Sequence, residues 1–123
     1  MTLSELIERL ERSDAGSDEL DRAIAQVCGV KWSADEDGNF GGYNILPRRC
    51  HFSRSLDAAL TLVPEGWRIG QFCELFNEPG GDWMCVLFTR NVDARGHEAG
   101  RSKKPAIALT LACLKALAAG KEQ

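Results

Sequence analysis

Apolar side chains recur at helical spacing near the start of the chain. The first such stretch has apolar residues at positions i, i+3, i+4 and i+7, namely Leu3, Leu6, Ile7 and Leu10. Thr2 and Glu5 have the spacing of a capping box, in which each side chain satisfies a free backbone amide. A second helix is expected to begin after Ser17 as its N-cap and to end at Gly29, where a left-handed residue belongs.

Two further helices are predicted. The third begins at Ser53 or Ser55, continues with apolar residues at helical spacing and stops before Pro64. The last helix has Pro105 as its first residue and extends to Ala119. Because this helix is apolar over most of its circumference, we expect it to be a packed central helix.

Between these helices the pattern predicts a β-hairpin. Along 67–76 the odd-numbered residues are expected on one face and the even-numbered residues on the other. The segment 77–81 has the residues of a turn, and 82–90 is the return strand. Its 83–88 part is apolar without alternation, which indicates a strand covered on both faces.

Two polar, glycine-containing segments, 33–50 and 91–104, are expected to be flexible loops. A short strand is expected at Tyr43–Leu46, inside the first of these two segments. The resulting order is α-α-(β)-α-β-β-α, which predicts an α/β protein of the α+β type with a small antiparallel sheet sandwiched between helices. A chain of 123 residues has the size of a single domain, here 1–123.

Composition places the chain among cytoplasmic globular proteins. Charged residues make up 27% and are spread along the sequence, so no stretch approaches the roughly 20 apolar residues that a membrane span needs. Polar residues interrupt the N-terminal region, which argues against a secretory signal. The five cysteines are odd in number and mostly flanked by apolar residues, so we expect reduced thiols in the core.

Basic residues gather before the third and fourth predicted helices. Helix N-termini favour anions, so these two groups would make one concave anion-binding site if they lay close together. The alternative is that they are solvated charges on surface loops. The six candidates are Arg48, Arg49, Arg54, Arg101, Lys103 and Lys104.

No catalytic motif is recognisable. Cys50 and His51 are adjacent, but side chains at i and i+1 point apart and share a proton with difficulty. A calcium loop starting at Asp35 would need glycine at its sixth position and glutamate at its twelfth, where Phe40 and Leu46 stand. The glycines form neither a dinucleotide-binding nor a P-loop pattern. We therefore assign no catalytic residue, metal or cofactor, although the lack of a motif does not exclude an enzyme.

Two long segments carry a family resemblance. Residues 53–67 (SRSLDAALTLVPEGW) resemble the helix-to-strand segment of small phage and prophage proteins with the phage ABA sandwich domain, and 105–117 resemble its closing helix. Residues 20–25 and 29–32 fit the opening of that domain. The resemblance implies a sheet between helices and a phage or prophage origin, hence a place in the cytosol of a bacterial host. It implies no activity, since the family has no established catalytic residues.

Two functions follow as hypotheses. The first is a non-catalytic phage accessory protein that binds a host protein. The second is an enzyme or sequestering protein for a nucleotide or another small phosphate-bearing anion, held by the basic residues. A net charge of −3 argues against a dedicated nucleic-acid binder, so any such binding should be weak, independent of base sequence and lost with salt. The sequence leaves the oligomeric state open.

Overall fold

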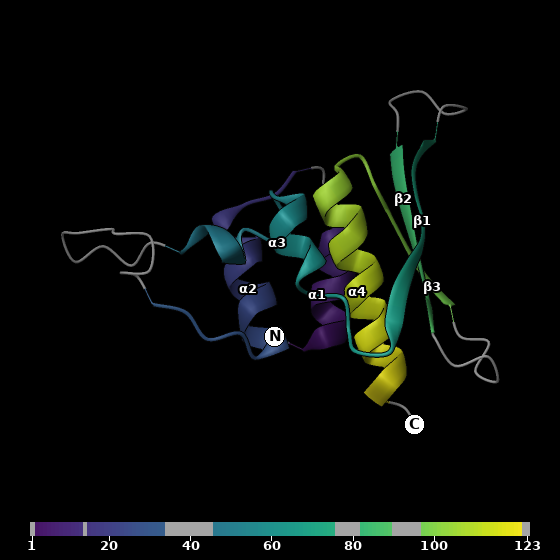
Figure 1. The fold of residues 1–123 in the computed structure, drawn as a ribbon. Helices are drawn as coiled ribbons and strands as arrows, with labels where there is room; N and C mark the ends of the chain where they lie inside the picture. The colour runs from purple at the N-terminus through teal and green to yellow at the C-terminus, as the bar shows by residue number, and fades with distance from the viewer. Residues whose placement is uncertain (1, 14, 34–45, 76–81, 90–96, 122–123) are drawn as a thin grey trace.

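The computed structural model describes residues 2–13, 15–33, 46–75, 82–89 and 97–121, and has the predicted mixed α+β class (Figure 1). Within these ranges, four α-helices and one 3₁₀ helix accompany a three-stranded antiparallel sheet of order β1-β2-β3. The elements are α1 (Leu3–Glu11), α2 (Asp18–Cys28), η1 (Arg48–Cys50), α3 (Leu56–Leu60), β1 (Trp67–Leu75), β2 (Asp82–Thr89), β3 (His97–Ser102) and α4 (Pro105–Lys121).

The predicted helix boundaries are largely confirmed by the capping contacts. The hydroxyl oxygen of Thr2 accepts a hydrogen bond from the backbone amide of Glu5 at 3.2 Å. The hydroxyls of Ser17 and Ser55 cap α2 and α3 in the same way. Gly29 ends α2 with φ +70°, a conformation that favours glycine. The third helix was predicted to continue to the residue before Pro64, but α3 ends at Leu60 and is therefore shorter. Helix α4 is longer than predicted and continues past Ala119 to Lys121.

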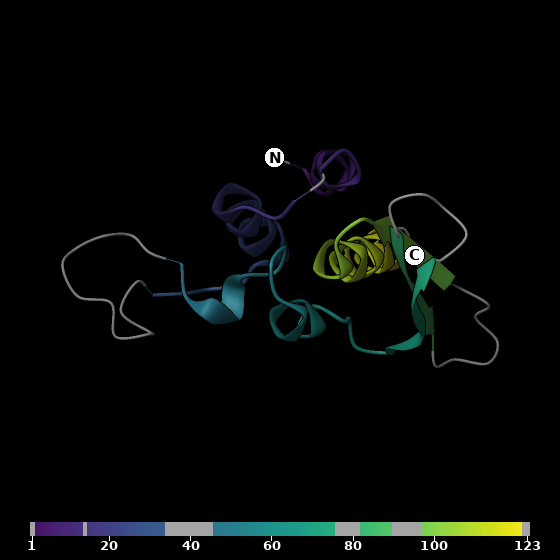
Figure 2. The same cartoon turned by 90° about the horizontal axis from the view of Figure 1, so that it is seen from above.

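Helix α4 is the centre of the molecule, as its sequence predicts. It lies between the sheet and the other helices, with α1 and α3 on opposite sides of it (Figure 2). Residues 106–114 of α4 are all buried. All helices in the described ranges lie on one side of the sheet, so the layers run sheet, α4, then α1, α2 and α3. No helix in those ranges is long and apolar enough to cross a membrane.

A β-bulge in β1 corrects the predicted faces of that strand. Ile69 pairs with Leu87 and Gln71 with Val86, so Gly70 is an extra residue between two pairs. The extra residue shifts the alternation by one position. Phe72 therefore lies on the same face as Ile69, toward α4, and the expectation that all odd-numbered residues share one face is wrong.

Strand β2 is covered on one face only by the described residues, which corrects the expectation for 83–88. Cys85 and Leu87 are fully buried against the helices. On the opposite face Met84 and Val86 are half-buried, and Phe88 is 39% exposed. The Phe88 ring packs over the bulge glycine, Gly70, on this face.

Part of the loop predicted at 91–104 is a strand. Residues 97–102 form β3, which pairs with β2 in antiparallel register. His97, expected in a mobile loop, belongs to this strand, and its ring centroid lies 6.2 Å from that of Phe88. A Cβ on Gly100 would lie 2.2 Å from the carbonyl oxygen of Ala108, so glycine is required where α4 crosses β3.

The other predicted loop, 33–50, is described only at its two ends. Leu46, Pro47 and Cys50 are buried around η1. The short strand expected at Tyr43–Leu46 lies outside the described residues except for Leu46, which is not in a strand.

A buried carboxylate ties the turn before α3 to α2. Asp21 is fully buried, and its Oδ1 accepts the amide of Ser53 at 2.7 Å and the Ser53 hydroxyl at 2.6 Å. Its Oδ2 accepts Nε of Arg54 at 2.7 Å. On the other side of the same turn, the carbonyl of Phe52 accepts the hydroxyl of the buried Thr110 at 2.9 Å. The turn is therefore fixed to α2 and α4 at once.

We expect Asp21→Asn to lower the free energy of unfolding by about 2 kcal/mol, because an amide NH₂ replaces one of the two buried oxygens that accept hydrogen bonds from Ser53 and Arg54. Urea denaturation measures this loss. Asp18→Asn is the matched control, since Asp18 lies one turn earlier, is about half exposed and pairs with Arg22 and Arg54. Its cost should stay below about 1 kcal/mol. Equal losses in the two variants would contradict a special role for the Asp21 contacts.

Candidate functional site

The six predicted anion-binding residues lie in three separate places. Arg48 and Arg49 are exposed on η1, and the guanidinium of Arg49 donates to the backbone carbonyl of Lys31. The other four divide between two hollows at the β3–α4 turn, where Lys103 lines one hollow and Lys104 the other. The single site that the sequence suggested is therefore not formed by all six.

Arg54 and Lys104 come from the two different basic groups and line the same hollow. They line a hollow of about 420 Å³ at the start of α4, which we call the basic hollow. It forms because the Asp21 and Phe52 contacts hold residues 52–54 beside the first turn of α4. Its lining residues are Gly16, Ser53, Arg54, Leu56, Lys104, Pro105 and Ala106.

The charge of the basic hollow is lower than its two cations suggest. Nε of Arg54 is paired with Asp21 at 2.7 Å, and Nη2 lies 3.9 Å from Asp18. Two carboxylates thus offset the guanidinium. Lys104 is exposed and has no ion pair within the described part of the chain, so it supplies the cation that is available to a ligand.

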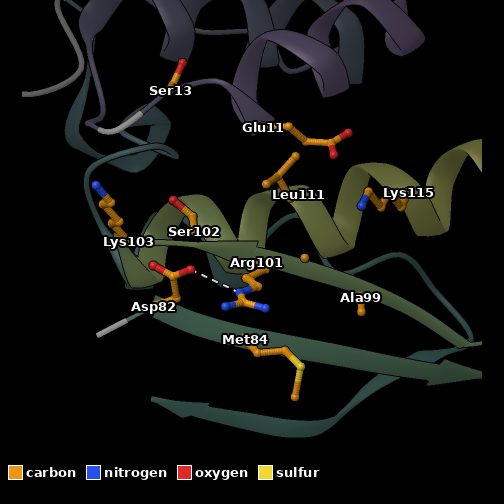
Figure 3. Close-up of a pocket in the computed structure, with 11 residues that line it drawn as sticks. Glu11, Ser13, Asp82, Met84, Ala99, Arg101, Ser102, Lys103, Leu111 and Lys115 are labelled. Atoms are coloured by element: carbon orange, nitrogen blue, oxygen red, sulfur yellow. Dashed lines mark hydrogen bonds and ion pairs between the residues drawn. The ribbon is translucent and has the colours of Figure 1, made fainter. Parts of the chain in front are cut away.

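Arg101 and Lys103 line a second hollow, a polar cleft of about 470 Å³ between the end of α1 and the strand β3. Nε of Arg101 is paired with Asp82 at 3.0 Å, as the dashed line in Figure 3 marks. Glu11 and Lys115 line the opposite wall of this cleft (Figure 3). Glu11 and Asp82 therefore offset part of the charge of the three cations Arg101, Lys103 and Lys115 in this cleft.

A third hollow is apolar throughout. It measures about 210 Å³ and is bounded by α3, β1 and α4; we call it the apolar groove. Four large hydrophobic residues are exposed among the described residues, and three of them line this groove. Their exposed fractions are 40% for Leu56, 46% for Leu60 and 37% for Ile69. Its lining residues are Leu56, Leu60, Ile69, Phe72 and Leu109.

The sequence did not reveal the apolar groove for two reasons. Leu56 and Leu60 belong to an apolar stripe that normally indicates a buried helix face. The Gly70 bulge brings Phe72 to the same face as Ile69, which the simple alternation excludes. The glycine within the strand was the one signal, since such a residue often marks a bulge.

The apolar groove and the basic hollow are neighbours. Leu56 lines both. On α4, the basic hollow is lined by Pro105 and Ala106, and the groove by Leu109, three residues later and hence on the same helix face. Together they make an apolar surface that ends at Lys104.

The described residues offer little reactive chemistry. Cys50 is buried, and Nε2 of His51 lies 3.1 Å from the carbonyl oxygen of Leu46. Burial raises the pKa of the Cys85 thiol to about 11 and that of Cys113 to about 12. These two thiols are therefore neutral core groups at ordinary pH. The expectation of core thiols is confirmed for Cys50, Cys85 and Cys113, whereas Cys28 and Cys73 are half-buried. In the described ranges, no three His, Cys, Asp or Glu side chains are placed to hold a metal ion.

Comparisons with known proteins leave the family open. No family model matches the sequence, and no curated protein and no solved structure matches it. The resemblance to the phage ABA sandwich domain therefore stays a prediction.

We expect brief alkylation at pH 8 to modify the half-buried Cys28 and Cys73 and to spare the three buried thiols. The reason is that a thiol with a pKa near 11 has on the order of 0.1% thiolate at this pH and is also shielded. Peptide mass spectrometry locates the modified residues, and labelling in urea provides the fully reactive control. Fast native labelling of Cys85 or Cys113 would contradict the described core.

Proposed function

We propose that this protein acts by binding a partner protein through the apolar groove, without catalysing a reaction. The observation that carries the proposal is the concentration of exposed Leu56, Leu60 and Ile69 at one hollow. Single exposed hydrophobic residues are ordinary on protein surfaces, whereas contiguous exposed apolar surface is typical of interaction sites.

The energetic reason is burial of this surface by the partner. Complete burial of one leucine or isoleucine side chain contributes about 1.5–3 kcal/mol. The three side chains are already more than half covered, so their remaining surface contributes roughly half of that each. This is enough to make the groove the energetic centre of an interface, although a stable complex needs further contacts around it.

The edge of the sheet next to the groove supports the same proposal. Within the described sheet, β1 pairs with β2 alone, so its other edge has backbone groups that no strand occupies. Ile69 and Phe72 place part of the groove on this edge strand. An exposed edge is a known template for adding a strand from another chain.

We further propose that the protein comes from a phage or prophage and that its partner is a protein of the bacterial host. Both points are supported by the resemblance of residues 53–67 and 105–117 to the phage domain family, and by the lack of a recognisable catalytic motif. The groove is compatible with a host protein as its partner, since it needs only an apolar surface on the other side.

A second candidate function is binding of a small phosphate-bearing anion. It is favoured by one observation, which is that Arg54 and Lys104 both line the basic hollow. Against it stands the pairing of Arg54 with two carboxylates, which leaves Lys104 as the available cation.

We expect Leu56→Gln combined with Leu60→Gln to abolish partner capture. The double variant removes apolar contact surface at two half-exposed helix positions, and thermal unfolding of the purified variant checks that it is folded. The measurement is cross-linked affinity capture from bacterial lysate with quantitative mass spectrometry. A partner captured by the wild type should fall at least about tenfold with the double variant.

Phe88→Thr is the control for this experiment. Phe88 has a comparable exposed fraction, 39% against 40% for Leu56 and 46% for Leu60, but lies on the outer face of β2, away from the groove. Capture should be unchanged in this variant. Equal capture by the groove variant, or no protein enriched by the wild type at all, would overturn the proposal.

The anion hypothesis predicts a thermal shift with inorganic phosphate or nucleotides. A ligand at 100 times its Kd stabilises the fold by about 2.7 kcal/mol, which raises Tm by on the order of 10 °C for a domain of this size. Lys104→Gln should remove the shift and Lys103→Gln should keep it, because only Lys104 lines the basic hollow. The absence of any shift would rule out this second function.

A further inference from the structure

We propose that the apolar groove and the basic hollow form one docking site for an extended acidic–apolar segment of a partner protein. The apolar side chains of the segment lie between α3 and β1, and a carboxylate beside them pairs with Lys104. This inference deepens the proposed function and rests on it, since it specifies the chemistry of the bound segment.

Continuity of the two hollows is the first support. Leu56 forms a wall of both, and along one face of α4 the lining passes from Ala106 in the basic hollow to Leu109 in the groove. The two hollows therefore adjoin at Leu56 and follow one face of α4. The combined site is apolar along its length and cationic at one end.

Electrostatics select an acidic group at that end. Lys104 is exposed, directly precedes α4, and makes no ion pair among the described residues. The N-terminal end of the 17-residue helix α4 adds a positive partial charge beside it. Arg54 holds the rim in place through its contact with Asp21 and contributes less net charge.

The spacing of the groove favours an extended peptide. Leu56 and Leu60 stand one helical turn apart, which is a rise of about 6 Å. Alternate residues of an extended strand lie about 6.7 Å apart and point to the same side. Two apolar side chains at i and i+2 would therefore pack beside these two leucines, while the backbone lies next to the unpaired edge of β1.

The openness of the groove argues against a small lipid-like amphiphile. The groove measures about 210 Å³, less than the roughly 300–1,000 Å³ of small-molecule pockets, so an alkyl chain lying there would keep much of its surface in water. Pockets for small molecules bury about 70–90% of the ligand surface. A protein segment overcomes this limit because the rest of the partner covers its outer side.

The test measures binding of synthetic peptides to the full chain by fluorescence anisotropy. The probes carry two acidic residues next to an apolar–x–apolar pair, with the acidic end placed first in one peptide and last in another. Neutral versions replace Glu and Asp by Gln and Asn. We expect one acidic order to bind at least about tenfold more tightly than its neutral version.

Variants of adjacent lysines assign the charge contact. Lys104→Glu should weaken binding of the acidic peptide at least about tenfold and leave the affinity for the neutral peptide unchanged. Lys103→Glu makes the same change in net charge one residue earlier but faces the polar cleft, so its effect should be small. Leu56→Gln with Leu60→Gln should weaken both peptides. Unchanged thermal unfolding shows that these variants are folded.

The outcomes separate the inference from the proposed function. Equal binding of acidic and neutral peptides, or equal effects of Lys103→Glu and Lys104→Glu, overturns the acidic recognition and leaves the groove as a binding site. Groove-dependent capture of a whole protein with no peptide binding overturns the extended-segment model. Groove-dependent binding of a fatty acid in place of peptides overturns it in favour of a small amphiphile.

Discussion

The buried carboxylate of Asp21 is the interaction on which the arrangement of the site depends. A charge with no exposed surface must be satisfied by nearby donors, and here Ser53 and Arg54 provide them. This requirement fixes the turn before α3 against α2, while Thr110 fixes the same turn to α4. The position of α3, and with it one wall of the apolar groove, follows from these contacts. The same carboxylate also offsets the charge of Arg54, which makes the rim of the basic hollow less cationic than its sequence suggests.

A second constraint is the close approach of α4 to β3. Gly100 lies where any Cβ would collide with the backbone of Ala108 and Ala112, so the helix rests directly on the strand. Two residues after Gly100, the strand ends, and Lys103 and Lys104 form the turn into α4. This turn lies between two hollows, so that Lys103 lines the polar cleft and Lys104 lines the basic hollow. Neighbouring residues of the same type thus have different surroundings, which makes them a matched pair of probes.

The candidate site combines features that separately have ordinary explanations. Exposed leucines on a short helix, a strand edge and a lysine before a helix are each common in globular proteins. Here Leu56 links the apolar and the basic part, and Leu109 forms the floor beneath α3 and β1. The protein thereby presents apolar contact surface, one cation and a strand edge that is unpaired within the described sheet at adjoining places. An extended acidic–apolar segment uses all three, which is why we favour it over a small anion.

Local features of the chain were determined by the sequence itself. The caps at Thr2, Ser17 and Ser55, the glycine that ends α2 and the central apolar helix were all predictable, because each depends on residues a few positions apart. The class of the fold followed from these elements. Strand β3 was missed because its short polar sequence becomes a strand only by pairing with β2. The bulge at Gly70, the separation of the six basic residues and the apolar groove likewise depend on contacts between distant segments. Tertiary structure alone decided them, since pairing register and helix placement minimise the free energy of the whole chain and are not encoded in any local pattern.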